Sequence, residues 1–103
     1  MVQIELRDLR DMIHPLDASP FVIGRSYLVR TVTQYIVGRI VSANSQFIVM
    51  SNASWVPDTG RFSEALRTGV LSEVEPFVNN AIVGVGAIVD ATEWTHRFPT
   101  EGR

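Results

Sequence analysis

Cysteine and lysine are both absent from this chain of 103 residues. Without cysteine there are no disulfides or thiolate metal sites, and cysteine usage gives no indication of redox compartment. All nine basic residues are therefore arginines, whose planar guanidinium groups suit carboxylates, phosphates and aromatic faces. The formal net charge of −2 argues against a large sequence-independent grip on nucleic acid. Any contact with a polyanion has to be local.

Long apolar runs are also missing. Arg30 and Arg39 interrupt the most apolar stretches, so none reaches the roughly 20 residues of a membrane-spanning helix. Glu5, Asp8 and Asp11 stand where a secretory signal would have a basic start and an uninterrupted apolar run. These features predict a single domain that has no targeting segment and no membrane partner.

Residues 1–24 are predicted to form a separate segment. Alternation of apolar residues at its start fits a strand, whereas the spacing of the apolar residues Leu6, Leu9, Met12 and Ile13 fits one face of a helix. We favour a short amphipathic helix that ends before Pro15, because proline disfavours helical backbone at the residue before it. A linker follows.

Residues 25–94 have the pattern of a β-domain, rich in β-branched and aromatic residues. Gly38 lies at the centre of the most strand-like part, where it predicts a kink. Gly84 and Gly86 lie inside the last predicted strand, where glycine marks a bulge, a sharp bend or close backbone approach. Strands are predicted over 27–33, 35–41, 46–50 with an extension through Trp55, 74–78 and 81–92, with a turn at Asn44 and Ser45.

Two further segments complete the predicted organisation. Residues 52–69 are a polar insertion that contains a short helix over 61–68, which Gly69 ends. Residues 95–103 are polar and are predicted to form a loosely held tail.

Two stretches resemble the Sm-like family of small five-stranded barrels, which includes bacterial Hfq and forms rings. Residues 38–50, GRIVSANSQFIVM, are similar to the bent second strand, turn and third strand of Hfq. Residues 83–89, VGVGAIV, are similar to the second motif of the family, which has a glycine between apolar pairs. The resemblance implies an Sm-like (SH3-type) barrel and assembly of copies into a ring, with a hexamer as one form. Residues 27–88 also resemble small uncharacterised proteins of phages and prophages, which implies the host cytoplasm or a virion as the location.

The same comparison limits what can be carried over to this chain. Asn44 stands where the Sm-like turn has an aspartate, and Val85 stands where an arginine commonly precedes the glycine. The asparagine that reads bases in the family is missing, as is the tyrosine-lysine-histidine run of Hfq. Fold and ring formation are therefore the implied properties, while the usual RNA-reading residues are absent.

The insertion holds the candidate ligand-binding residues. Trp55 can stack on a base, and Arg61 can bind a phosphate near the start of a helix. In the alternative interpretation Trp55 covers the end of the barrel, Asp58 caps the helix and the arginines are solvated. The candidate residues are Asn52, Trp55, Asp58, Thr59, Arg61 and Arg67.

Enzymatic and metal-binding sites are less well supported. Asp58-Thr59-Gly60 is the tripeptide of aspartic proteases, but Pro57 precedes it, and Arg61 follows it where that family has a small apolar residue. A turn before a helix explains the same tripeptide. His14 and His96 lie at opposite ends of the chain, so we expect no metal site and no cofactor. Three arginines, Arg25, Arg30 and Arg39, are expected either to line a pore or to pair with Glu73, Glu75 or Asp90.

Together these features predict a non-enzymatic homo-oligomer that binds a nucleotide-like ligand or RNA at subunit boundaries. A cyclic-nucleotide defence signal is one concrete ligand. The alternative hypothesis is a structural or assembly protein of a virion that has no small ligand.

Overall fold

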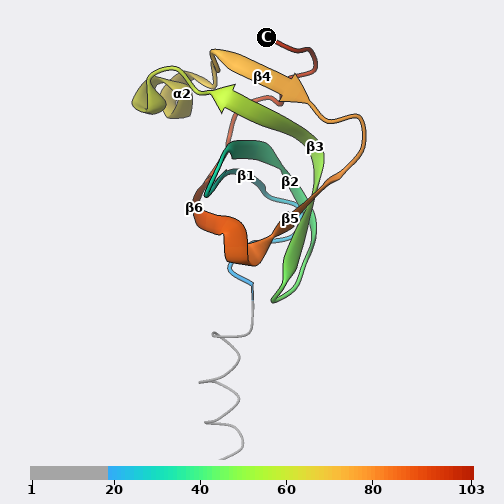
Figure 1. Cartoon of the computed structure of the whole chain (residues 1–103). Coiled ribbons are helices and arrows are strands. Elements are labelled where there is room, and N and C mark those ends of the chain that lie inside the picture. Colours follow the sequence, from blue (N-terminus) through green and yellow to red (C-terminus); the bar gives the residue numbers. More distant parts are fainter. Residues whose placement is uncertain (1–18) are drawn as a thin grey trace, which may run out of the picture.

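The computed structural model describes residues 19–103, which form a mainly β structure with one short helix (Figure 1). The expected N-terminal helix lies outside the described residues. The strands are β1 (Ser26–Thr31), β2 (Tyr35–Ala43), β3 (Phe47–Asp58), β4 (Glu73–Pro76), β5 (Ala81–Gly84) and β6 (Ile88–Glu93). The helix α2 (Phe62–Thr68) lies between β3 and β4, and the 3₁₀ turn η1 (Val85–Ala87) lies between β5 and β6.

All strands pair antiparallel in one small sheet with the order β4–β3–β2–β1–β6. The first half of the long strand β3 pairs with β5 and its second half with β4. The sheet curves so that β6, the last strand along the chain, pairs with β1, the first strand along the chain (Figure 1). It is not closed into a barrel, because β5 and β6 are joined through η1 without pairing with each other. This corrects the expected five-stranded barrel: the predicted strand 81–92 is two strands with different partners.

Gly38 lies where β2 and β3 bend together. The register shifts by one residue opposite it, and Asn52, in the bulge of β3, has a left-handed φ of 50°. A Cβ at Gly38 would lie 3.1 Å from Ala53 Cα and 3.1 Å from the Ser51 carbonyl oxygen. Glycine therefore permits the close approach of two backbones at this bend.

Gly84 and Gly86 lie at the sharp bend where β5 gives way to η1. Neither has a positive φ, and a Cβ on either would meet nothing within 4 Å. Of the predicted alternatives, the sharp bend is therefore present. Close approach of two backbones within the chain does not require glycine at either position.

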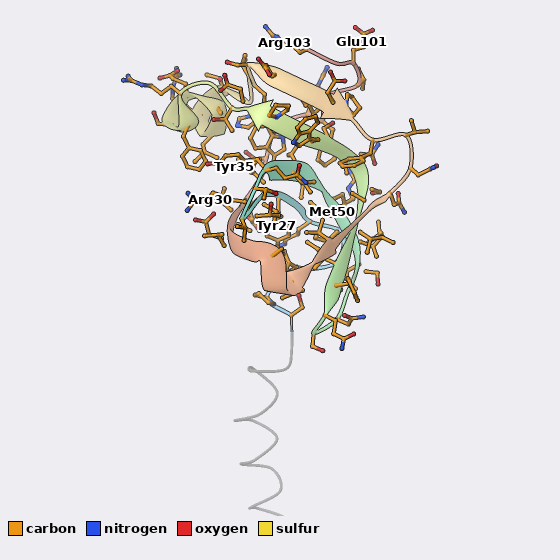
Figure 2. All side chains as sticks on the ribbon, viewed as in Figure 1. Tyr27, Arg30, Tyr35, Met50, Glu101 and Arg103 are labelled. Carbon is orange, nitrogen blue, oxygen red and sulfur yellow. The ribbon has the colours of Figure 1, made fainter. Side chains whose placement is uncertain are left out.

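Apolar side chains pack on both faces of the sheet, which explains why β1 and β2 are apolar almost without interruption. One cluster lies inside the curve of the sheet, toward which Tyr27 and Met50 point (Figure 2). The other lies on the opposite face, where α2 and Trp94 cover it. The buried residues of the inner cluster are Tyr27, Val29, Ile36, Ile40, Ile48, Met50, Ala53, Ala81 and Val83. Those of the outer cluster are Leu28, Val37, Val56, Ala65, Leu71, Val74 and Trp94.

The helix α2 is short and ends where the sequence places a glycine. Its first turn follows Arg61 without a side-chain cap. Gly69 has a φ of 77°, and its N–H donates to the Ala65 carbonyl at 2.8 Å. This left-handed conformation is the usual reason for glycine after a helix. Within residues 19–103, no helix has the length and apolar character needed to cross a membrane.

Residues 94–103 pack against the sheet, which corrects the expectation of a loosely held tail. Trp94 is 3% exposed, and Phe98 packs against the outer cluster. Near the end, the Arg103 N–H donates to the Val74 carbonyl at 2.7 Å, and the Val74 N–H donates to the Arg103 carbonyl at 3.0 Å. The prediction for residues 95–103 failed because Phe98 supplies apolar area that the polar average of the segment conceals.

Candidate functional site

The candidate ligand-binding side chains lie in separate places. Asn52, at the bulge of β3, lines a hollow of about 610 Å³ together with the loop of residues 77–80. Trp55 lines a different hollow, of about 340 Å³, beside the turn between β1 and β2. The other four candidates lie near the end of β3 and on α2 and line neither hollow: Asp58, Thr59, Arg61 and Arg67. The structure therefore does not bring the six together in either hollow.

The tripeptide at residues 58–60 forms a turn at the exposed end of β3. Asp58 Oδ1 accepts a hydrogen bond from the Gly60 N–H at 2.8 Å, and Thr59 Oγ1 donates to the Gly60 carbonyl at 2.8 Å. Gly60 has a φ of 72°, which favours glycine. Asp58 thus stabilises the turn and not the first turn of α2, so the interpretation of this aspartate as a helix cap is wrong.

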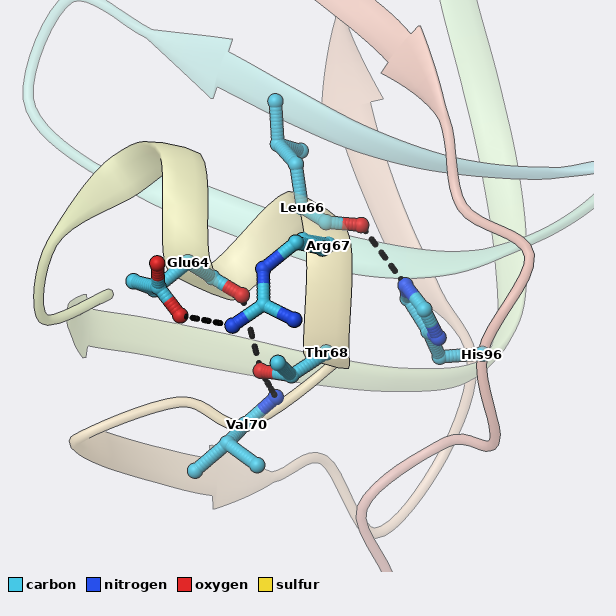
Figure 3. Close-up of polar contacts among 6 residues, drawn as sticks. All are labelled: Glu64, Leu66, Arg67, Thr68, Val70 and His96. Carbon is cyan, nitrogen blue, oxygen red and sulfur yellow. Dashed lines mark hydrogen bonds and ion pairs between the residues drawn. The ribbon is translucent and has the colours of Figure 1, made fainter.

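The polar side chains on α2 make contacts that hold the helix and its surroundings (Figure 3). Arg67 pairs with Glu64 at 2.5 Å, and both are exposed. His96 donates from Nε2 to the Leu66 carbonyl at 2.7 Å and thereby ties the segment after β6 to the last turn of the helix. The two residues are 30 positions apart in the sequence, and no local sequence pattern predicts this hydrogen bond. Arg61 is exposed at the start of the helix.

Trp55 is the candidate residue that the structure places best for stacking. The indole is 40% exposed. Its hollow is also lined by the polar residues Thr33 and Gln34 of the β1–β2 turn and by Arg30, whose guanidinium pairs with Asp90. An exposed aromatic face beside such groups can hold a planar base by stacking and hydrogen bonding. The other lining residues are Thr31, Val32, Tyr35, Val56 and Pro57.

Ion pairs join β1 and its preceding residue to β6. Arg30 donates from Nε to Asp90 Oδ1 at 3.2 Å and from Nη2 to the other carboxylate oxygen. Hydrogen bonding to Asp90 and the negative charge of its carboxylate raise the pKa of Arg30. Arg30 therefore pairs with one of the expected partners, Asp90. The other two arginines do not pair with an expected carboxylate: Arg25 pairs with Glu93 at 2.8 Å, and the guanidinium of Arg39 lies 5.6 Å from the centre of the Phe98 ring.

The outer edge of β5 is unpaired within residues 19–103. On the inner side, the Val85 N–H donates to the Gln46 carbonyl at 2.8 Å. Backbone groups of successive residues point to alternate sides of a strand, so Val83 faces β3, whereas Ile82 and Gly84 direct theirs outward. The Ile82 side chain is 70% exposed.

The outer edge of β6 is also unpaired in the part of the chain that the structure describes. On the inner side, the Trp94 N–H donates to the Ser26 carbonyl at 2.8 Å. The same alternation directs the backbone groups of Ala91 and Glu93 outward. Residues 89–93 are all exposed, so this part of β6 is uncovered on both faces. Strands in folded proteins ordinarily have at least one buried face.

Two hollows with apolar linings flank β6. The apolar lining of the larger, of about 480 Å³, includes Phe21, Tyr27, Val85 and Ile88. The smaller, of about 300 Å³, is lined by Tyr35 and by Phe62 and Leu66 of α2. Ala91 of β6 contributes to both. Sequence reasoning missed β6 as a separate element because it continued one strand through η1; the closely spaced Gly84 and Gly86 were the available signal.

No group of three or more histidine, aspartate or glutamate side chains suited to a metal ion occurs among residues 19–103. Comparisons with protein-family models, with curated proteins and with solved structures found no match to this chain. Its function is therefore inferred from its own geometry.

Proposed function

We propose that this protein is a non-enzymatic homo-oligomer whose copies join when β5 of one copy pairs with β6 of the next. One observation carries the proposal. The two strands lie at opposite ends of the path β5–β3–β2–β1–β6, and each presents outward backbone groups that have no partner among the described residues. An uncovered strand edge of this kind is a template for pairing with another chain.

Side chains along the two edges support the same arrangement. Ile82 on β5 is 70% exposed and Val89 on β6 is 57% exposed, which leaves apolar groups in water at both edges. Pairing of the two edges would remove apolar surface of both side chains from water, which favours association. Gly84 fits the proposal too, because its missing Cβ leaves room for the backbone of a neighbour where the chain itself makes no contact.

The two edges are different surfaces, so a contact between them is head-to-tail. Such contacts form a ring when the rotation between copies closes and a filament when it does not. The resemblance to the Sm-like family, with its bent strand pair at Gly38, supports a ring, and the phage-protein resemblance supports a role in the host cytoplasm or in a virion.

The mass of the intact assembly tests this proposal. We expect the full chain to form one species whose mass is an integer multiple of the chain mass. Ile82→Pro should yield the monomer, because proline removes one outward N–H while leaving the bonds to β3 intact. Ala91→Pro should do the same from the other edge.

Matched controls separate the backbone effect from the side-chain effect. Ile82→Thr and Ala91→Ser keep the outward N–H groups and should remain largely assembled. A wild-type protein that is monomeric at high concentration, or proline variants with unchanged mass, would show that the edges do not join copies.

A second proposal concerns a ligand: Trp55 stacks on the base of a nucleotide-like molecule or of RNA. The partly exposed indole beside the polar β1–β2 turn supports it. Because Trp55 is exposed and Trp94 is buried, a bound base should quench the fluorescence of the first tryptophan. We expect nucleotides or short RNA to quench the wild type and not Trp55→Phe. Assembly without any quenching would favour a structural or virion-assembly role.

A further inference from the structure

We propose that residues 99–103 are a built-in cover for the outer edge of β4, which prevents a strand of a second copy from adding there. This edge is distinct from those of β5 and β6, so the inference stands whether or not those two strands join copies.

The backbone of β4 shows that its outward positions are blocked. On the inner side, the Phe77 N–H donates to the Ala53 carbonyl at 2.9 Å, so alternation directs the backbone groups of Val74 and Pro76 outward. Pro76 has no N–H to offer. Val74 has both groups bonded to Arg103 at 2.7 and 3.0 Å. Proline and a covering segment are two known means of protecting a sheet edge.

The other two edges lack both devices. Neither β5 nor β6 contains proline, and no described segment pairs with their outer sides. The three edges of this sheet therefore differ: that of β4 is blocked by Pro76 and by the backbone bonds between Val74 and Arg103, whereas those of β5 and β6 are open within residues 19–103. Blocking the third edge limits each copy to two strand-pairing neighbours, as in a ring or an unbranched filament.

The cover is separable from the anchors that hold the segment before it. His96 bonds to the Leu66 carbonyl, and Phe98 packs on the outer cluster. Beyond these anchors, the chain passes over a hollow of about 320 Å³ lined by Val70, Leu71 and Pro99, among others, before Arg103 reaches β4. Figure 2 shows Glu101 and Arg103 at this end of the molecule, beside β4. The cover can thus be removed while both anchors stay in place.

Loss of the cover has a definite consequence. The N–H and C=O groups of Val74 would lose their partners, and the apolar residues of the hollow would become more exposed. Free backbone groups beside exposed apolar side chains favour the addition of an extended strand, since main-chain hydrogen bonds supply the affinity. A second copy of this chain is the partner present at the highest concentration in a purified sample.

A truncation after Pro99 and the substitution Arg103→Pro test the cover. The truncation removes the residues that reach β4, and the substitution removes the N–H that donates to Val74. Arg103→Ala is the matched control, because it keeps both backbone hydrogen bonds. Sedimentation velocity over a range of concentrations measures the result, with circular dichroism and Trp94 fluorescence reporting whether the fold is kept.

We expect the truncated protein and Arg103→Pro to form species heavier than the wild-type assembly at concentrations where wild type and Arg103→Ala show one mass. The peptide RFPTEGR, which corresponds to residues 97–103, should reverse this association when added to the truncated protein, and RFPTEGP should not. Unchanged mass in both variants would overturn the proposal. If the truncated protein does not fold, the comparison of Arg103→Pro with Arg103→Ala decides.

Discussion

Two buried hydroxyl groups in this protein have opposite environments. Ser54 is fully buried in β3, and its Oγ has no hydrogen-bond partner among residues 19–103. Thr31 is also buried, at the end of β1, but its Oγ1 donates to the Gln34 carbonyl at 2.9 Å and accepts from the Gln34 N–H at 3.1 Å. A buried polar group without a partner lowers stability, whereas one that is fully bonded holds its turn in place.

Ser54→Ala should therefore leave the free energy of unfolding unchanged or raise it by about 1 kcal/mol, since it removes an unsatisfied group. Thr31→Val should lower it by roughly 1–3 kcal/mol, because the partly buried Gln34 N–H loses its acceptor. Urea unfolding followed by tryptophan fluorescence measures both. Destabilisation by Ser54→Ala comparable to that of Thr31→Val would mean that the serine hydroxyl does have a partner.

At the scale of elements, the end of α2 shows how a local signal and a distant contact act on one residue. Gly69 adopts the left-handed conformation that ends the helix. A Cβ at this position would also lie 2.5 Å from the Cβ and Cγ of His96, which is docked on the same turn. Backbone strain and steric conflict therefore both exclude larger residues.

Gly69→Ala should lower the free energy of unfolding by more than the roughly 1–2 kcal/mol expected for a left-handed non-glycine residue alone. The same substitution in a His96→Ala background should cost only that backbone part, because the conflicting ring is gone. A double-mutant cycle from urea unfolding separates the two contributions. Equal costs in both backgrounds would show that His96 does not press on this position.

At the scale of the whole molecule, the arrangement of bonded and unbonded strand edges is the main feature. The edge of β4 is covered, while those of β5 and β6 are open within residues 19–103. The outward N–H groups of Ile82 and Ala91 have no acceptor in the described chain, whereas alternation places those of Val83 and Thr92 against β3 and β1.

Amide hydrogen exchange should therefore depend on assembly at the outward positions. We expect the N–H groups of Ile82 and Ala91 to be protected in the assembled wild type. The Ile82 N–H should exchange rapidly in monomeric Ala91→Pro, and the Ala91 N–H should exchange rapidly in monomeric Ile82→Pro. Val83 and Thr92 should stay protected in both states and serve as internal references. Rapid exchange at both outward positions in the assembly would place its contacts elsewhere.

Much of the β structure could be read from the chain because its signals are local. Asn44 makes the predicted turn, with its Oδ1 accepting from the Gln46 and Phe47 N–H groups at 2.7 and 2.8 Å. The division of residues 81–92 into two strands could not be read, since both halves are apolar and β-branched and only their partners differ. Nor could the docking of residues 94–98, which depends on an outer cluster that the sheet must first create.

The sequence by itself determined that the chain is mainly extended, that it turns at Asn44 and that it bends at Gly38, because these depend on side-chain alternation and on backbone freedom within a few residues. Only the tertiary structure decided which strand edges are covered and that the candidate ligand-binding residues lie in separate places. Those properties depend on pairing between segments distant in sequence, and the energy of such pairing is set by the register and curvature of the whole sheet.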